Sequence, residues 1–566
     1  MTKIFQIFNK INSLKLFYII IIFSLILSIL EYIFIFTIYS LVDYQLVDNL
    51  NPYLVNIILF FEQNYQVDLK IFDFILVFVI GVFCLKTTIY IFYNYIISYF
   101  SQNISFKLAS KIFANSFNDK KDVLINNRNS SYYKNTIIVD IPLFISSVVQ
   151  PLFFLISDAL ILIAILIFLF YSNALVSFYL ILFIFLTCLI FYLYLKNKLI
   201  IWGNIREQSS TNLIKNLNEV YKGLLEIKIY NVAKFFFNKV SNELNNIRGS
   251  LTKLNFFIHI PRIVLEIIIF FSIFLLIFLS SNNDSNISIL PYLSAAVAAS
   301  IKIIPMFSRI MTGVQGYYFA REVVSKINFL IKNNFIKDNF FKTIKKFNSI
   351  NEIRIKNLSF RFKNKILINK LNLNIKKKKI IGVTGESGSG KSTLARILGG
   401  VEKNFTGTIK YYNNQDRLSY ESPILGLTAI IPQDVFAFDD TLENNISFQI
   451  NKIDLENKKL ITNLTKKLDI DTKRRIGEDG KKISGGQKQR LGVVRSLFFD
   501  KEFIIFDEST SNLDTNNKTI LLNTIKKLKE KKLILIISHD KKFLDICDSV
   551  YELKKGKLKL KKKLKN

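Results

Sequence analysis

The 566-residue sequence predicts an α-helical membrane domain of six spans, followed by an α/β domain that contains a phosphate-binding loop. Long apolar runs fill most of the first 325 residues, whereas short apolar strands, turns and polar helices follow residue 351. The run GESGSGKST at 385–393 has the glycine spacing of a loop that holds phosphates. We therefore expect a membrane domain at 1–325, a linker at 326–350 and an α/β domain at 351–566.

The composition favours a membrane protein and gives no sign of a disulfide or zinc site. Hydrophobic residues make up 50% of the chain, with 53 Phe and 25 Tyr. Its three cysteines, Cys84, Cys188 and Cys547, lack pairing or ligand spacing and fit small buried hydrophobes. The formal net charge of +33 is scattered along the chain, and part of it suits a cytoplasmic membrane face, so we expect no nucleic-acid partner.

Six apolar segments reach the length of about 20 residues that a helix needs to cross a bilayer. Several are longer than this, so these helices are expected to continue into the cytosol. The segments lie at roughly 16–42, 71–100, 143–171, 174–195, 256–280 and 288–312.

The loops between the spans predict their orientation. Residues 196–255 contain ten Lys or Arg against four Glu, and the loop between spans two and three is also basic. The loops after spans one and five carry more acidic than basic residues. The positive-inside rule places the basic loops, both termini and the α/β domain of this predicted multi-pass membrane protein in the cytoplasm. The outer loop contains the amphipathic stretch 50–63, either an interfacial helix or an ordinary packed one.

The glycine loop predicts a nucleotide site. Apolar residues 380–384 read as a strand, and a helix follows the loop, which is the required context. Backbone amides would face phosphate oxygens, Lys391 would reach the β and γ phosphates, and Ser392 would ligate magnesium. The candidate binding residues are Gly385, Glu386, Ser387, Gly388, Ser389, Gly390, Lys391, Ser392 and Thr393.

A second apolar strand, 503–506, ends in Asp507 and Glu508. Its end places Asp507 beside the metal and Glu508 where it can polarise an attacking water.

These motifs, together with ISGGQKQR at 483–490, resemble the ATP-binding domain of an ABC transporter. The first 325 residues resemble the six-helix membrane domain of the exporter class, so the fold class is a P-loop NTPase domain of ABC type behind a membrane domain. In that family the signature, here Ser484, Gly485, Gly486 and Gln487, binds ATP held by the glycine loop of the other subunit. The resemblance therefore implies a half-transporter that dimerises, most simply as a homodimer, and uses ATP and Mg²⁺.

The same resemblance assigns further positions. Phe362 stands where an aromatic ring stacks on adenine, Gln433 matches the magnesium-contacting Q-loop residue, Asp514 matches the D-loop, and His539 matches the switch histidine that contacts the γ phosphate. The catalytic residues implied are Glu508, His539 and Gln433, and the implied metal ligands are Ser392, Gln433 and Asp507.

Three further segments match parts of the family that link the two domains. The stretch 477–480 resembles a loop that senses the membrane domain. Short helices near 129–133 and 223–230 are implied as contacts with the ATP domain.

Ionisable residues inside the spans are the candidates for substrate contacts. Arg262 and Glu266 are four residues apart and are expected to pair on one helix face. Lys302 and Arg309 are seven apart and share a face with no acid nearby in their own segment, so they form an unpaired basic stripe for an anionic headgroup. The alternative is that Arg309 reaches the interface or pairs with Glu31 or Asp158 of another helix.

Segments IPRIVLE, SLILSILEYIF and SIKIIPMFSRI resemble bacterial lipid-linked oligosaccharide flippases of the PglK type, and 50–63 stands where that group has an external helix. The resemblance implies an ATP-driven translocase in a bacterial inner membrane that moves a polyprenyl-pyrophosphate-linked oligosaccharide or similar anionic glycolipid. Export of lipid A, peptides or drugs by the same ATPase mechanism is the alternative. An ATPase acting on DNA or ribosomes is disfavoured by the six spans, and a purely regulatory ATP switch by intact Glu508 and His539.

Overall fold

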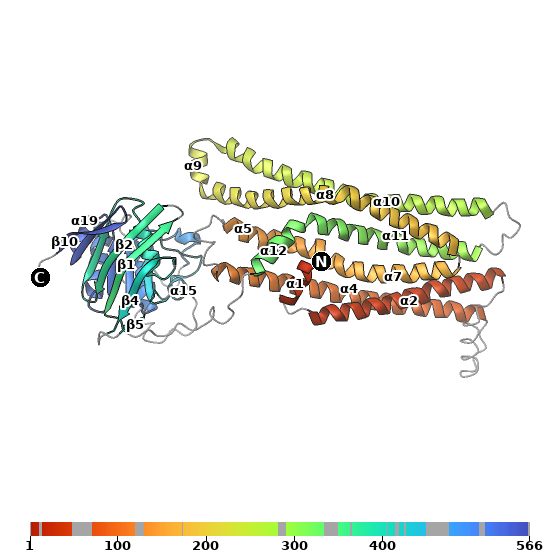
Figure 1. Ribbon diagram of the computed structural model, residues 1–566, viewed down its shortest axis with the longest axis horizontal. Coiled ribbons are helices and arrows are strands. Elements are labelled where there is room, and N and C mark those ends of the chain that lie inside the picture. Colours follow the sequence, from red (N-terminus) through yellow and green to blue (C-terminus); the bar gives the residue numbers. More distant parts are fainter. Residues whose placement is uncertain are drawn as a thin grey trace. The chain divides into compact units, whose positions relative to one another are not determined.

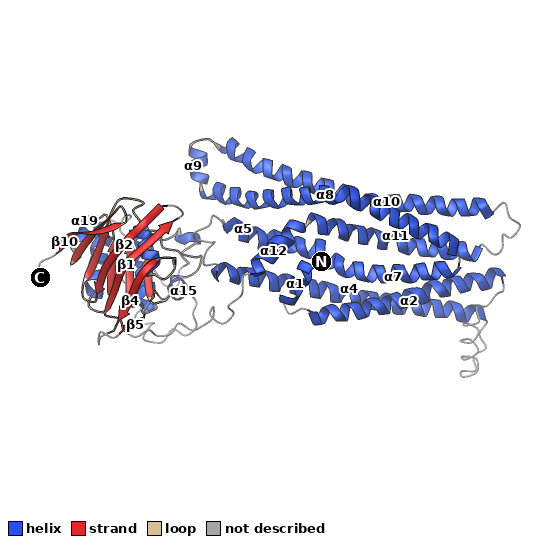
Figure 2. Cartoon of the chain, viewed as in Figure 1, coloured by secondary structure: helices blue, strands red, loops and turns tan. Residues whose placement is uncertain are grey.

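The structure is a computed structural model that divides into two compact units, Met1–Ile336 and Lys337–Asn566. It describes residues 2–10, 14–47, 71–118, 130–172, 174–280, 290–332, 349–362, 365–402, 404–413, 418–420, 422–423, 426–448, 475–508 and 515–563. In the described part the first unit is helical, and both sheets lie in the second (Figure 2). The predicted outer stretch 50–63 and Asp514 lie outside the described residues.

The first unit consists of long helices that run alongside one another (Figure 1). Their apolar composition fits lipid as the surrounding solvent, because a helix satisfies all its backbone hydrogen bonds internally. The helices are α1 (Thr2–Lys10), α2 (Leu14–Val47), α4 (Ile71–Asn118), α5 (Ser130–Asn135), α6 (Ile141–Phe144), α7 (Gln150–Ser172), α8 (Ala174–Lys222), α9 (Leu224–Ile229), α10 (Ala233–Ser280), α11 (Leu290–Phe319) and α12 (Arg321–Lys332).

The described part of each expected span falls within one long helical stretch, and six spans remain a prediction. Within the described residues, four stretches are long and apolar enough to cross a membrane: Phe17–Ile38, Leu76–Ser116, Ser130–Ile167 and Ala233–Phe271. Helices α4, α8 and α10 have 48, 49 and 48 residues. At 1.5 Å per residue each is about 70 Å long, more than twice the hydrocarbon thickness, so each has room to continue outside the bilayer.

The helix before α7 contains two π-helical turns, Thr136–Asp140 and Ile145–Val149, on either side of α6. Such turns are rare and often mark functional sites. The first turn presents Asp140, which is fully buried, to Lys326 of α12 at 2.9 Å and to Arg206 of α8 at 3.3 Å. Lys326 also pairs with Glu207. Burial lowers the pKa of Lys326, but these two carboxylates outweigh it and leave the pKa above its usual value.

Close helix crossings depend on glycine. A Cβ atom added at Gly203 of α8 would lie 1.9 Å from the carbonyl oxygen of Phe319 in α11, and one added at Gly316 would lie 2.8 Å from that of Ser147. Only glycine lets these backbones meet at such distances.

The second unit contains a mostly parallel six-stranded sheet in the order β10-β9-β3-β8-β7-β6 and a four-stranded antiparallel sheet in the order β2-β1-β4-β5. Strands β3, β7 and β8 are runs of Ile, Val, Leu and Phe that are buried almost throughout, as expected for parallel strands covered on both faces. The strands are β1 (Glu352–Phe362), β2 (Lys365–Lys376), β3 (Ile380–Thr384), β4 (Thr406–Tyr412), β5 (Leu418–Tyr420), β6 (Thr428–Ile431), β7 (Phe503–Asp507), β8 (Leu533–Ile537), β9 (Ser549–Lys554) and β10 (Lys557–Lys563).

Helices of the second unit follow or cover these strands. Adjacent carboxyl ends of β3, β7 and β8 bring the segments that follow them together at one edge of the sheet. The helices are α14 (Lys391–Leu398), α15 (Leu442–Ser447), α17 (Gly485–Phe498), α18 (Thr515–Leu528) and α19 (Lys541–Asp545).

Candidate nucleotide site

The glycine loop runs from the end of β3 into the N-terminus of α14. Gly385, Gly388 and Gly390 have φ values of 151°, 75° and 106°, which side chains with a Cβ adopt rarely. A Cβ at Gly385 would also lie 2.4 Å from the carbonyl oxygen of Leu553. The sequence therefore folds this turn so that backbone amides and the positive end of α14 meet at one point, which suits an anion.

Lys391 lies at the centre of the loop. Its buried side chain donates from Nζ to the carbonyl oxygens of Gly385 (2.6 Å) and Glu386 (3.0 Å). Ser389 Oγ is buried and has no hydrogen-bond partner within the described structure. A buried hydroxyl of this kind is expected to find a partner, so the loop fits a ligand with phosphate oxygens. Ser387 and Glu386 are exposed, and Thr393 is buried in the first turn of α14.

The end of β7 brings two acids to the loop. Ser392 Oγ donates to Asp507 Oδ1 at 3.4 Å, and Glu508 Oε1 lies 3.7 Å from Lys391 Nζ. His539, after β8, places Nε2 at 3.8 Å from the same Glu508 oxygen. Burial raises the pKa of the Asp507 carboxyl, the hydrogen bond from Ser392 opposes the rise, and the neighbouring Glu508 adds to it. Five residues predicted from three separate motifs thus lie within hydrogen-bond or ion-pair distance of at least one other member of the group.

The signature lies beside Gln433 and not beside the glycine loop of the same chain. Ser484 caps α17, since its Oγ accepts from the backbone N–H of Gln487 while the Gln487 side chain accepts from the backbone N–H of Ser484. The exposed first turn of this 14-residue helix presents Ser484 and Gly485 to solvent, whereas Gly486 is buried. A cavity of about 320 Å³ contains Gly485 and Gln433 but no glycine-loop residue in its lining.

Two residues that the sequence analysis missed tie α17 to the segment after β6. Gln489 Nε2 donates to the carbonyl oxygens of Pro432 (3.1 Å) and Gln433 (2.5 Å). Arg495 donates to the carbonyl oxygens of Phe436 and Asn445, and burial lowers its pKa to about 10. No sequence signal pointed to them, because residues six apart lie about 120° apart around a helix and share no face.

The remaining sequence-predicted residues are placed as follows. Phe362 is the last residue of β1 and is partly exposed, as a stacking ring must be. Gly477 precedes a short 3-10 turn, Glu478–Gly480, and Gly480 also lines the 320 Å³ cavity beside Gln433. The expected contact near 223–230 contains α9, where Leu225, Ile229 and Tyr230 are exposed.

The predicted unpaired basic stripe is wrong. Lys302 Nζ lies 3.3 Å from Glu31 Oε1, and Arg309 makes two hydrogen bonds to Asp158, at 2.7 and 2.9 Å. The acids come from α2 and α7, which pack against α11 but are remote in sequence. The alternative pairing of Arg309 with Asp158 is therefore confirmed, as is the pair of Arg262 with Glu266 at 2.7 Å.

Comparison with known proteins agrees with this geometry. The model of the ABC transporter family matches residues 368–511, which run from β2 through the glycine loop and the signature to the end of β7. A bacterial Atm1-family ABC exporter with ATP bound superposes with a TM-score of 0.72 at 16% identity, over 95% of this chain and 93% of that one. The chain has the fold of an ABC exporter half-transporter.

Curated relatives of this half-transporter cover it in part. An export ATP-binding/permease protein of Rickettsia typhi is 26% identical over 62% of this chain and 62% of its own length. An ATP-dependent lipid A-core flippase of Colwellia psychrerythraea is 27% identical over 36% of this chain and 37% of its own length. The half-transporter thus spans less than two thirds of the curated relatives that it matches.

The predicted fold class is confirmed, since the half-transporter has a helical N-terminal region followed by an ABC-type ATPase domain. The family of that domain also implies that it binds ATP.

Proposed function

We propose that this half-transporter hydrolyses ATP as a dimer and uses the energy to move an anionic glycolipid across the inner membrane, with its ATPase domain in the cytoplasm. The meeting of Lys391, Asp507, Glu508 and His539 at one sheet edge carries the ATPase proposal. These residues supply a phosphate-binding cation, a metal-binding carboxylate, a base and a switch histidine.

Each residue has a separate role in hydrolysis. Lys391 binds the β and γ phosphates, Glu508 orients and polarises the attacking water, and His539 holds the γ phosphate. Mg²⁺ would supply charge neutralisation between the phosphates when held by Ser392, Gln433 and Asp507. Phe362 supplies a ring for the adenine, while Ser484 to Gln487 and Asp514 contribute to the partner's nucleotide.

The dimer follows from the position of the signature. Ser484 and Gly485 are exposed at the N-terminus of α17, where they can bind the phosphates held by a second chain. Two identical chains would build two such sites. Helix α9 has exposed apolar side chains, which favour a contact with the ATPase domain. We propose that this contact transmits conformational changes of the ATPase domain to the membrane domain.

The charges around Glu31 support an anionic substrate. Glu31 pairs with both Lys86 (3.1 Å) and Lys302 (3.3 Å), so three charged groups leave one net positive charge. The Glu31 and Lys86 side chains are 6% exposed, whereas that of Lys302 is 37% exposed. Lys302 is therefore the group that can bind a lipid phosphate. Arg309 lies two turns further along α11, where its pair with Asp158 leaves it less able to bind the phosphate.

Translocation of a fluorescent polyprenyl-pyrophosphate oligosaccharide in proteoliposomes tests this function. We expect ATP-dependent transport by the wild type. Lys302→Gln should reduce transport at least about tenfold, the rate equivalent of 1.4 kcal/mol, because the phosphate contact is lost. The fold should survive, since Glu31 keeps Lys86 as a partner.

Lys215→Gln, which removes an exposed cation of α8, is the control and should transport normally. An ATPase-active wild type that moves lipid A but not the polyprenyl lipid would favour the second candidate substrate. The name of the Colwellia relative supports that alternative.

A further inference from the structure

We propose that the membrane unit holds one acyl chain of an anionic bilayer phospholipid in an apolar cavity between α1, α2, α7 and α11. The cavity has a volume of about 420 Å³. This lies within the roughly 300–1,000 Å³ typical of ligand pockets. The proposal concerns a bound lipid that is not transported, and it does not depend on which substrate is moved.

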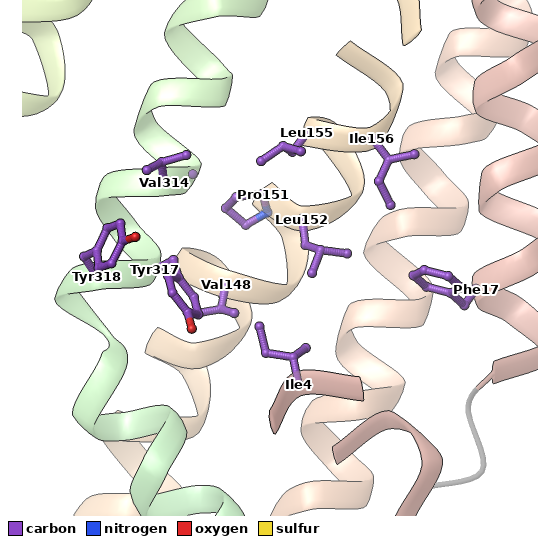
Figure 3. A pocket seen from close by; sticks show the side chains of 11 residues that line it. Ile4, Phe17, Val148, Pro151, Leu152, Leu155, Ile156, Val314, Tyr317 and Tyr318 are labelled. Atoms are coloured by element: carbon purple, nitrogen blue, oxygen red, sulfur yellow. The ribbon is translucent and has the colours of Figure 1, made fainter. Parts of the chain in front are cut away.

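The lining suits a hydrocarbon chain. Phe17 of α2 lies on one side and Tyr317 and Tyr318 of α11 lie on the other, with Ile4 of α1 and with Leu152 and Leu155 of α7 between them (Figure 3). Ile4 and Phe17 also belong to the buried core of the unit, so the wall that they form is anchored. An apolar cavity of this size gains little from water, because water needs polar partners.

Its depth matches the cytoplasmic edge of the bilayer. Phe17 lies at the start of the expected span 16–42, and Tyr317 and Tyr318 follow the expected end of the last span at residue 312. Tyrosine is enriched at membrane interfaces, where its ring is apolar and its hydroxyl is wet. The cavity would thus have the hydrocarbon core of the bilayer on one side and the cytoplasmic headgroups on the other.

A cation lies at the rim and favours an anionic headgroup. Lys196 of α8 places Nζ 5.7 Å from the centre of the Tyr318 ring. It directly follows the apolar segment 174–195, the position from which a lysine reaches the headgroup region. The combination of a chain-sized apolar cavity with an interfacial cation at its rim selects an anionic phospholipid over a neutral one.

The single tryptophan of the chain provides the test. Trp202 packs against the same apolar cluster as Tyr318, which lines the cavity, so we expect a brominated chain in the cavity to quench its indole. The dimer is reconstituted in phosphatidylcholine nanodiscs with increasing fractions of phosphatidylglycerol that carries brominated acyl chains, which quench tryptophan on contact. We expect saturable quenching at a mole fraction at least fivefold lower than with brominated phosphatidylcholine.

Variants separate the chain site from the headgroup site. Leu155→Phe fills the cavity and should raise the half-quenching fraction at least fivefold, whereas Lys196→Gln should abolish only the preference for phosphatidylglycerol. Lys198→Gln is the matched control, because Lys198 stacks on Tyr194 outside the cavity, and it should behave as the wild type. Equal quenching by both lipids in the wild type, or no effect of Leu155→Phe, overturns the proposal.

Native mass spectrometry of the wild type needs no variant. Retained phosphatidylglycerol, in preference to phosphatidylcholine, is the expected result. Absence of retained lipid, together with disulfide cross-linking of Leu155→Cys to a second copy, would show that protein fills the cavity and would overturn the proposal.

Discussion

Glu508 is held in a conformation that residues other than glycine adopt rarely. Its φ is 50°, its backbone N–H donates to the carbonyl oxygen of Ile537 at 2.9 Å, and its carboxylate faces both Lys391 and His539. Strained backbone at such a position is a common mark of functional residues. The geometry supports Glu508 as the proposed base, because it points toward the loop that would hold the γ phosphate.

Glu508→Gln should lower ATPase activity by about 10²- to 10⁴-fold, since the amide cannot accept the proton from water. ATP binding should persist, because Lys391 and the loop amides are untouched. Steady-state phosphate release and binding of a fluorescent ATP analogue measure the two effects. Glu530→Gln, at an exposed position, is the control. Retention of more than about a tenth of the wild-type rate would remove Glu508 from this role.

Asp540 caps α19 directly after His539. Burial raises its pKa, but hydrogen bonds from Lys518 (2.7 Å) and the backbone of Lys542 (3.0 Å) outweigh burial and lower the pKa below its ordinary value. The carboxylate therefore stabilises the fold above its unfolded-state pKa of about 3.9, and this contribution is lost as the pH falls through the lower folded-state pKa.

Asp540→Ala should cost about 1 kcal/mol at pH 7, and the difference from wild type should shrink below about pH 4. Thermal unfolding of the full chain at both pH values measures this. Asp545→Ala, which removes only a surface ion pair with Lys562, should have a smaller effect. Equal losses for the two variants would show that the cap contributes nothing.

Two glycines within long helices have opposite surroundings. A Cβ at Gly203 would collide with the backbone of Phe319, whereas Gly249 of α10 has no atom within 4 Å of its added Cβ. The same substitution therefore tests packing at one site and helix propensity at the other.

Gly203→Ala should destabilise the membrane unit by about 1–3 kcal/mol through overpacking. Gly249→Ala should stabilise it by up to about 1 kcal/mol, because alanine loses less entropy in a helix. Thermal unfolding in detergent compares the pair. Stabilisation by both substitutions would mean that α8 and α11 cross less closely than the 1.9 Å approach at Gly203 requires.

Hydropathy and strand pattern were sufficient to predict the helices and the α/β order, because lipid and parallel-strand burial impose long apolar runs. The π-helical turns around α6 have no such pattern. The pairing of Arg309 with Asp158 could be raised only as an alternative and that of Lys302 with Glu31 was missed, since these acids lie on other helices and become neighbours only on folding. At the nucleotide site, motif spacing identified Ser392 and Asp507, whose contact the structure adds, but gave no sign that Gln489 bonds to the Q-loop backbone.

The whole molecule is proposed to work only as a pair of chains. Within one chain, the glycine loop meets Glu508 and His539, while the signature lies beside Gln433. Each cluster is half of the site that ATP would need. The domain boundaries at 325 and 351, the inner-membrane location and the cytoplasmic termini remain predictions, as does the composite site itself.

The most direct test of the composite site is an ATP-dependent cross-link between Ser387→Cys in the glycine loop and Ser484→Cys in the signature, both at exposed positions. The Glu508→Gln background traps bound ATP, and Cys84 and Cys188 are changed to Ser. Cys547 can stay, because burial raises its pKa to about 12 and keeps the thiol unreactive. We predict a disulfide-linked dimer that forms with ATP and Mg²⁺ and disappears when Lys391→Ala is added. A cross-link that is independent of ATP or confined to one chain, or no cross-link at all, would contradict the composite site.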